Sequence, residues 1–354
     1  MTPRRVVFVS HNASRSGAPL LLLQVERWLR EHRDLDVTTV LLAGGPLVED
    51  FEAAGGAHPV EDLASLAPDL VYLNTVGSAP ALAQVPAGTR VVCHVHELDY
   101  ALTHWITEDD RAALRDRVDR FLVVSDLVAD ALRRCVGIED ERIVRHYGFV
   151  DVGAVRDAVQ GPPPAAAVGS GPLVAASGTT EWRKAPDLFV ALAAVVHRRR
   201  PDVRFVWVGG SATGPEIDGV LADRDRLGLR DVVAFVGEQE DARPWFAASD
   251  VFALVSRDDP FPLTCLEAAA LGVPVVAFDS TGAREFLADG CGVVVPYPDV
   301  ESMAEAVLHL LDDPDRVRAL TGAARRRVEA GHDLAGAVPR LVAEIESLLP
   351  GGPS

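Results

Sequence analysis

Short, continuous apolar runs rich in β-branched residues alternate along this sequence with segments of helical periodicity. Such runs are typical of parallel strands buried on both faces. Their alternation with helices favours right-handed βαβ units and doubly wound sheets. The runs form two sets of six, at residues 4–10, 37–43, 70–75, 90–96, 120–125 and 142–148, then 172–178, 203–209, 232–237, 251–256, 273–279 and 291–296.

A stretch rich in proline and glycine, residues 159–172, separates the two sets and is expected to be a linker. The sequence therefore predicts an α/β protein with two Rossmann-like domains, at residues 1–164 and 165–334. A C-terminal helix within residues 335–354 is expected to pack back onto the first domain. Two such domains that face each other would enclose a cleft.

Charge and cysteine content exclude several classes of protein. The 354 residues carry 34 basic and 52 acidic side chains, a net charge of −18, which argues against sequence-independent nucleic-acid binding. None of the four cysteines forms a CxxC pair, so zinc and redox motifs have no support. No signal peptide is visible, and residues 19–29 are too short to span a bilayer. A bacterial, cytoplasmic location is expected, with peripheral contact at the inner membrane face left open.

Ligands of open α/β sheets bind beyond the carboxyl ends of the strands, so the loops that follow the strands are the candidate sites. The first such loop of the second domain contains Gly178, Thr179, Arg183 and Lys184, the only lysine of the chain. Small residues, a lysine and a helix start at Pro186 together favour an anion site, although a Walker order is absent. The alternative is an ordinary surface pair of arginine and lysine.

Other loops on the same edge carry weaker indications. Gly209 and Gly237 follow strands in glycine-rich turns that could also be plain turns. In the first domain, Gly17 begins a helix directly after the first strand, so backbone could approach a ligand closely there. His96 ends the strand 90–96, but a lone histidine there could also be structural.

Residues 257–279, RDDPFPLTCLEAAALGVPVVAFD, contain an apolar helix with one charge. Pro262 suits the first helical position and Gly272 ends the helix, which is predicted at 262–271. A helix without a polar face is buried, so the carboxylate of Glu267 needs partners. Those partners are either a ligand, shared with Asp259 eight residues upstream, or an internal salt bridge or loop cap.

Taken together, these loops resemble the retaining GT-B glycosyltransferases of family 4 (glycosyltransferase group 1). The resemblance covers nearly the whole chain and is strongest over residues 172–300. EAAALGVPVVAFDSTGAREFL, at 267–287, matches the family's Glu-Ala-x-x-x-Gly-x-Pro-Val-Val segment, and Asp259 with Glu267 has the spacing of its acid-x7-Glu motif. VSHNASRSGAPLLLL resembles the amino-terminal glycine loop of the family, and HVHEL occupies the place of its histidine.

The sequence departs from the family pattern at three positions. Asp259 stands in place of the usual glutamate, and Pro262 in place of a common glycine. Thr179 stands where the family has an arginine for the diphosphate, whereas Lys184 keeps the family's lysine. Arg183 is a candidate for the missing positive charge.

The resemblance implies transfer of a sugar from a nucleotide-diphosphate sugar, with no metal or other cofactor, to a saccharide, lipid-linked or small-metabolite acceptor. It places Glu267 on the ribose, Asp259 on the donor sugar, and Lys184 with the helix start on the diphosphate. The acceptor would dock on the first domain. Two alternatives stay open: an epimerase or hydrolase of nucleotide sugars, and a non-catalytic homologue. The implied catalytic residues are Asp259, Lys184 and His96, and the implied binding residues are Glu267, Lys184, Arg183, Gly178, Thr179, Gly17, Gly209, Gly237, Leu263 and Thr264.

Overall fold

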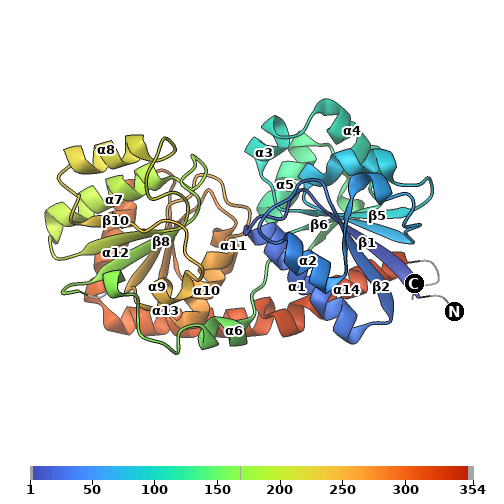
Figure 1. Cartoon of the computed structure of the whole chain (residues 1–354). Helices are drawn as coiled ribbons and strands as arrows, with labels where there is room; N and C mark the ends of the chain where they lie inside the picture. The colour runs from blue at the N-terminus through green and yellow to red at the C-terminus, as the bar shows by residue number, and fades with distance from the viewer. Residues whose placement is uncertain (1–2, 168, 350–354) are drawn as a thin grey trace. The chain divides into compact units, whose positions relative to one another are not determined.

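The computed structural model describes residues 3–167 and 169–349 (Figure 1). The chain forms two compact units: unit 1 runs to Tyr147 and resumes at Ala335, and unit 2 is Gly148–Leu334. The predicted boundary at 164/165 is therefore wrong, because residues 148–164 belong with the second sheet. Helix α6 (Val152–Asp157) packs on α10 (Leu263–Leu271), and Val150 forms a β-bridge with Asp333.

Unit 1 contains a parallel sheet of seven strands. All six strands predicted for this half are present. The additional edge strand β3 (Ala57–Pro59) has three residues, too few for an apolar pattern to be recognised. The sheet order is β3 (Ala57–Pro59), β2 (Leu35–Leu41), β1 (Arg4–Ser10), β4 (Leu70–Asn74), β5 (Arg90–Val95), β6 (Arg120–Val123), β7 (Ile143–Arg145).

The helices of unit 1 follow the strands in the expected alternation. Helix α14 (Leu334–Leu348) is amphipathic, and its buried residues, Ala337, Val338, Leu341, Val342 and Ile345, lie at helical spacing. From Ala335 onward the chain packs within unit 1, as expected for the C-terminal helix. The helices are α1 (Gly17–His32), α2 (Val48–Ala54), α3 (Asp99–His104), α4 (Glu108–Arg117), α5 (Asp126–Cys135) and α14 (Leu334–Leu348), with 3-10 turns at Val60–Asp62, Val76–Gln84 and Asp140–Arg142.

Unit 2 contains a parallel sheet of six strands, and all six correspond to predicted ones. Its order is β10 (Val233–Phe235), β9 (Arg204–Val208), β8 (Leu173–Ser177), β11 (Val251–Leu254), β12 (Val275–Phe278), β13 (Val293–Val295). Its remaining helical segments are the 3-10 turn Ala165–Ala167, α7 (Pro186–Arg199), α8 (Asp218–Arg226), α9 (Arg243–Ala247), α11 (Ala283–Leu287), α12 (Val300–Asp312), α13 (Pro314–Arg327) and the π-helical turn Val328–His332.

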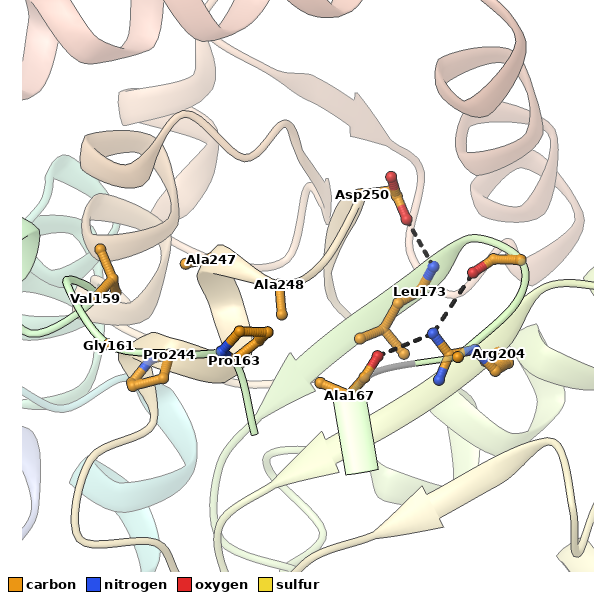
Figure 2. Close-up of a pocket in the computed structure, with 12 residues that line it drawn as sticks. Val159, Gly161, Pro163, Ala167, Leu173, Arg204, Pro244, Ala247, Ala248 and Asp250 are labelled. Atoms are coloured by element: carbon orange, nitrogen blue, oxygen red, sulfur yellow. Dashed lines mark hydrogen bonds between the residues drawn. The ribbon is translucent and has the colours of Figure 1, made fainter. Parts of the chain in front are cut away.

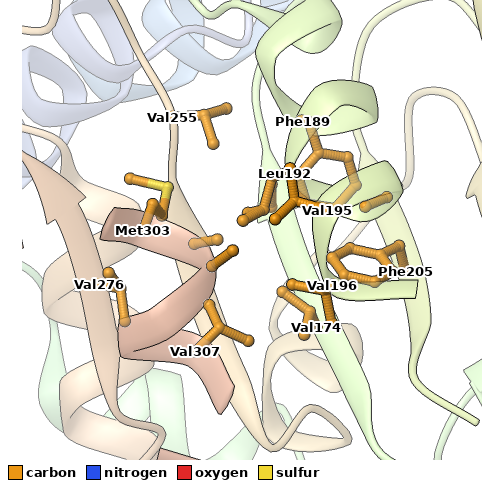
Figure 3. Packing of buried hydrophobic residues seen from close by; sticks show 14 of the residues in the cluster. Val174, Phe189, Leu192, Val195, Val196, Phe205, Val255, Val276, Met303 and Val307 are labelled. Atoms are coloured by element: carbon orange, nitrogen blue, oxygen red, sulfur yellow. The ribbon is translucent and has the colours of Figure 1, made fainter. Parts of the chain in front are cut away.

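The core of unit 2 fixes the sheet on which the candidate site is built. Helices α7 and α12 pack against each other, and Phe189 of α7 and Met303 of α12 both belong to the buried cluster of this unit (Figure 3). Both side chains are fully buried, and full burial of such a side chain contributes roughly 1.5–3 kcal/mol. The two helices therefore share one buried core with the strands of this sheet.

In both units the strand order reverses beside the first strand. The chain of unit 2 proceeds from β8 through β9 to β10 and then returns to the other side of β8 at β11. Unit 1 does the same between β1 and β4. Loops that leave adjacent strands in opposite directions open a crevice at their carboxyl ends, which is the usual binding site of such sheets.

Candidate functional site

The crevice expected from the strand order of unit 2 is the place between the loops that follow β8 and β11. The backbone N–H groups of Arg257 and Asp258 donate to the carbonyl of Arg183, at 2.8 and 3.3 Å. These bonds join the lysine loop to the acidic loop of residues 257–262. The sequence placed the two loops on the same edge of the sheet, and the structure brings them into direct contact.

Lys184 and Asp259 form an ion pair across this crevice. Lys184 Nζ lies 2.6 Å from Asp259 Oδ2. Asp259 is only 4% exposed, so its charge requires a close partner. The carbonyl of Asp259 accepts a hydrogen bond from Gly282 N at 2.9 Å, which fixes the backbone of the acid. The only lysine in the sequence therefore balances a buried carboxylate at the candidate site.

The backbone around Lys184 is shaped for this position. Gly178 has φ +154°, and a Cβ there would lie 2.9 Å from Lys184 Cγ. Ala185, which is fully buried, adopts a left-handed conformation with φ +60°, and Pro186 then begins α7. Non-glycine residues in that region are uncommon and concentrate at functional sites. The lysine is thus held between a glycine that leaves room for its stem and a strained alanine.

A second charged pair, which the sequence did not identify, lies beside the first. Arg183 Nη1 is 3.6 Å from Asp258 Oδ1, and Asp258 is 7% exposed. Burial raises the pKa of the Asp258 carboxyl, and Arg183 opposes that rise. Glu181 accepts hydrogen bonds from Arg183 at 3.0 Å and from Thr179 at 2.8 Å. The motif spacing indicates only the second aspartate of RDDP, Asp259. The pairing of Asp258 with Arg183 became visible only in the structure.

Glu267 is the charged residue of the apolar helix α10. The helix begins at Leu263 with Pro262 as its N-cap, one residue later than predicted, and Gly272 ends it in the left-handed conformation, φ +80°. Glu267 is half-buried, and over residues 3–167 and 169–349 its carboxylate accepts no hydrogen bond and forms no ion pair. Among those residues the structure shows neither an internal salt bridge nor a loop cap at Glu267.

The electrostatic surroundings of Glu267 leave its charge only partly compensated. Burial raises the pKa of Glu267 to about 7; Arg243 lowers it and Asp241 raises it. Arg243 itself is paired with Asp241, whose carboxylate lies 2.6 Å away. Glu267 is therefore an unsatisfied hydrogen-bond acceptor in a partly dry position.

The start of α10 offers donors next to these acids. In the part of the chain that is described, the N–H groups of Leu263 and Thr264 donate to no protein acceptor. Unfilled amides at a helix start attract anions, because the helix dipole places partial positive charge there. Glu267 lies four residues after Leu263, or about 6 Å along the axis.

The glycine-rich turns hold the neighbouring loops together. Gly209, at φ +109°, donates its N–H to the carbonyl of Gly237 at 2.9 Å, and a Cβ at Gly209 would lie 2.8 Å from Gly178 O. The N–H of Gly178 donates to Val208 O at 3.0 Å. Both N–H groups are used in hydrogen bonds within the protein and are not available to a ligand. The glycines instead allow the loops that follow β8, β9 and β10 to lie close together.

In unit 1, His96 follows β5 directly, at the carboxyl edge as expected. Its ring lies 4.2 Å from that of His94, whose Nδ1 is 2.6 Å from Tyr72 Oη. Burial, together with the nearby His11 and His146, lowers the pKa of His96 to about 3. His96 is therefore a neutral imidazole at physiological pH.

Thr75 directly follows β4, at the point where the strand order of unit 1 reverses, and the sequence did not single it out. Its φ is +84°, an outlier for a β-branched residue. Thr75 Oγ1 lies 3.1 Å from His11 Nδ1, and the next amide, that of Val76, donates to Glu97 Oε2 at 3.3 Å. Gly17, exposed at the start of α1, follows β1 at the same edge. The crevice residues of unit 1 are therefore drawn from three strand ends, which no local pattern joins.

A cavity of about 470 Å³ lies at the opposite edge of the sheet of unit 2, where β8 and β9 begin (Figure 2). Its polar side chains bind backbone: Arg204 Nη2 donates to Ala167 O at 2.9 Å, and Asp250 Oδ2 accepts from Leu173 N at 2.8 Å. These bonds hold the linker on the sheet. The cavity is separate from the lysine crevice.

Residues 3–167 and 169–349 contain neither a metal-binding cluster nor a membrane-spanning helix. No group of three or more His, Cys, Asp and Glu side chains there is arranged to hold a metal ion. No helix there combines the length and the apolar content that crossing a membrane requires.

Two family sequence models match this chain. Residues 171–313 match "Glycosyl transferases group 1", and residues 56–154 match "Glycosyltransferase Family 4". The first match lies within unit 2 and contains Lys184, Asp259 and Glu267.

Curated relatives are similar over part of their length. The lipopolysaccharide core mannosyltransferase LpsB of Rhizobium meliloti is 32% identical over 50% of this chain and 52% of its own. A D-inositol 3-phosphate glycosyltransferase of Catenulispora acidiphila is 33% identical over 57% and 50%. The α-D-kanosaminyltransferase of Streptomyces kanamyceticus is 27% identical over 67% and 65%. The chain thus spans about half the length of the first two relatives.

Solved structures match over nearly the whole chain. Anabaena HepE, in complex with UDP and glucose, has a TM-score of 0.83 at 19% identity and covers 97% of this chain and 99% of its own. WaaG, a glycosyltransferase involved in lipopolysaccharide biosynthesis, has a TM-score of 0.71 at 17% identity over 98% and 100%. These likenesses confirm the predicted GT-B fold.

Proposed function

We propose, because this chain belongs to the group 1 glycosyltransferases of family 4, that it transfers a sugar from a nucleotide-diphosphate sugar to an acceptor hydroxyl with retention of configuration. The observation that carries the proposal is the Lys184–Asp259 pair, 2.6 Å long, at the reversal point of the strand order in unit 2. Glu267, on the helix that borders this crevice, has an unused acceptor.

The donor would occupy the crevice along α10. Lys184 and the amides of Leu263 and Thr264 would hold the diphosphate, because they combine a full positive charge with unfilled helix donors. Glu267, about 6 Å further along the helix, would accept hydrogen bonds from the ribose hydroxyls. That contact supplies the partner which the carboxylate lacks in the free protein.

Lys184 would also act in the chemical step. As the bond from the sugar to the diphosphate breaks, negative charge grows on the leaving phosphate. A cation already held in place by Asp259 stabilises that charge more than it stabilises the bound donor, which accelerates the reaction. Removal of one preorganised contact of this kind costs about 3 kcal/mol, or roughly 100-fold in rate.

Asp259 would then be shared between Lys184 and hydroxyls of the donor sugar. The aspartate is one methylene shorter than the usual glutamate, so its carboxylate extends less far from the backbone. At this shorter reach it still contacts Lys184 directly. Arg183, held by Glu181 and Asp258, would supply the second positive charge near the diphosphate in place of an arginine at Thr179. The unusual donor end of this site would therefore set the choice of sugar.

The acceptor would bind to unit 1 at the ends of β1, β4 and β5. His96 is neutral there and offers a nitrogen to an acceptor hydroxyl without a competing charge. The relatives named above include transferases of mannose and kanosamine and one that acts on D-inositol 3-phosphate. A saccharide, a lipid-linked saccharide or a small hydroxylated metabolite is the corresponding acceptor class here.

A donor screen tests this function. Thermal shift with UDP, GDP and ADP and with their sugars should identify one nucleotide that stabilises the protein, and Lys184→Met should lose most of the shift. Mixing the selected donor with saccharide acceptors should then yield a glycoside of retained configuration. Release of free sugar or of a sugar isomer without any acceptor would identify a hydrolase or epimerase. Binding without turnover of any donor would identify a non-catalytic homologue.

A further inference from the structure

In the described part of unit 1, large exposed apolar side chains follow strand ends at the carboxyl edge of the sheet. Among its described residues these are Leu20, Tyr100 and Trp105, which are 40%, 40% and 55% exposed. Leu20 lies in the first turn of α1, which follows β1, while Tyr100 lies on α3, which follows β5, and Trp105 directly ends that helix. Exposed apolar side chains that lie together, as Tyr100 and Trp105 do, mark binding surfaces, and these follow a strand end where ligands are expected.

Three aromatic rings are arranged together at α3. Tyr100 and His104 stack with centroids 4.6 Å apart and an interplanar angle of 24°, and Trp105 meets Tyr100 edge-on at 6.5 Å. His104 Nδ1 donates to the carbonyl of Tyr100 at 2.9 Å, which fixes the ring and leaves Nε2 as its outer polar atom. We call these three side chains the aromatic platform.

The platform has the chemistry that recognises a sugar ring. The faces of aromatic rings carry partial negative charge and attract the partially positive C–H groups on the apolar face of a pyranose. Tyr and Trp also combine this face with a polar tip, which suits a ligand whose rim is made of hydroxyls. His104 Nε2 adds a hydrogen-bonding group at the same place.

The charge around the platform argues against a membrane as its partner. Residues 96–110 contain five acids and neither lysine nor arginine. The arginines that reach this segment are engaged, Arg134 by Asp99 at 2.8 Å and Arg111 by Glu108 at 2.9 Å. Attachment to an anionic bilayer needs unpaired basic residues beside the aromatic ones, so an uncharged polar ligand fits better.

We propose that Tyr100, His104 and Trp105 form a stacking platform for a neutral sugar ring of the acceptor. This inference rests on the proposed function and narrows it, because it makes the acceptor a saccharide whose ring lies on α3. Glu97 and His96 precede the platform by only a few residues, so a sugar held on α3 would present a hydroxyl near the end of β5.

The test uses the full chain and a panel of neutral sugars, namely methyl α-D-glucopyranoside, methyl α-D-mannopyranoside, maltose and cellobiose. Saturation-transfer NMR should detect binding of at least one of them at millimolar concentration. Trp105→Ala should weaken that binding about tenfold, because a stacked face is lost. Trp105→Phe should retain much of it, and Leu227→Ala, a loss of an equally exposed apolar side chain in unit 2, should leave it unchanged.

Nucleotide binding is measured on the same variants to keep the two proposals apart. Trp105→Ala should retain the thermal shift caused by the selected nucleoside diphosphate, which also shows that the variant is folded. Equal sugar binding by Trp105→Ala and wild type would overturn the platform, as would failure of wild type to bind any sugar of the panel. Trp105-dependent binding to phosphatidylglycerol vesicles without sugar binding would overturn it in favour of a membrane. Failure of wild type to bind any of the nucleotides would contradict the proposed function instead.

Discussion

Lys184 Nζ contacts Asp259 Oδ2 at 2.6 Å across the crevice between the loops that follow β8 and β11. Asp259 is almost fully buried, and the lysine side chain is 22% exposed. The pair is thus both a stabilising contact and the positive end of the proposed donor site. The two roles can be separated by experiment, because stability and nucleotide binding are measured independently.

Removal of Lys184 should destabilise the fold more than removal of a surface arginine. Lys184→Met leaves Asp259 buried and unpaired, at an expected cost of about 3 kcal/mol in the free energy of unfolding. Adding Asp259→Asn should recover a large part of that loss, because the unpaired charge disappears. Urea unfolding of the two single variants and the double variant measures the coupling.

The exposed pair of Arg27 and Asp50 provides the control for this cycle. Its atoms are 2.8 Å apart, but the side chains are 51% and 45% exposed. Arg27→Met should cost less than about 1 kcal/mol. Simple additivity of Lys184→Met and Asp259→Asn would show that the pair is not a coupled unit.

Gly178→Ala tests how the backbone positions Lys184. The added Cβ would lie 2.9 Å from Lys184 Cγ at a residue with φ +154°, so the lysine has to move. Gly214 also has positive φ, +105°, but a Cβ there has no atom within 4 Å. Gly178→Ala should therefore reduce nucleotide affinity roughly tenfold, about 1.4 kcal/mol, whereas Gly214→Ala should affect stability alone. Titration with the nucleotide measures the affinity of both variants. Equal affinities of Gly178→Ala and Gly214→Ala would rule out this steric role.

Glu267 gives the pH dependence of stability an unusual sign. Its pKa is raised from 4.5 to about 7 by burial, so the folded protein holds a proton that the unfolded chain releases. The free energy of unfolding therefore falls as the pH rises from about 4.5 to about 7, by roughly 3 kcal/mol from this group. Glu267→Gln removes the titrating group, so the free energy of unfolding should decline less between about pH 5 and pH 8. Urea unfolding curves taken across this pH range measure the difference.

Glu26 is another carboxyl that contributes to the same decline. Burial raises its pKa to about 7, opposed by a hydrogen bond from Thr39 and by Arg30 and Arg27. It lies on α1 and belongs to unit 1. Glu26→Gln should flatten the stability profile without an effect on nucleotide affinity, whereas Glu267→Gln should weaken the nucleotide. Identical effects of both variants on nucleotide affinity would remove Glu267 from the ribose contact.

The fold was predictable because its elements are encoded locally. Continuous β-branched runs such as VVFV and VVAF indicate buried parallel strands, and Gly272 ends α10 where its sequence indicates. The short strand β3 was missed, and so was the unit boundary, because the contacts of α6 with α10 join segments far apart in the chain. Proline content alone did not locate the division between units.

The site was only partly predictable for the same reason. Motif spacing singled out Lys184, Asp259 and Glu267 one at a time. It did not indicate that Lys184 pairs with Asp259, because that contact spans 75 residues. Asp258 and Thr75 depend on burial and on a backbone angle, and neither leaves a pattern in the sequence.

The most direct test of the central claim is calorimetric titration of the nucleoside diphosphate selected by the donor screen into wild type, Lys184→Met and Glu267→Gln. The account predicts saturable binding to wild type at one site per chain. It also predicts at least tenfold weaker binding for Lys184→Met, and a comparable loss for Glu267→Gln that disappears when the ligand is inorganic diphosphate without ribose. Undiminished binding to both variants would contradict the assignment of the donor site to the β8–β11 crevice.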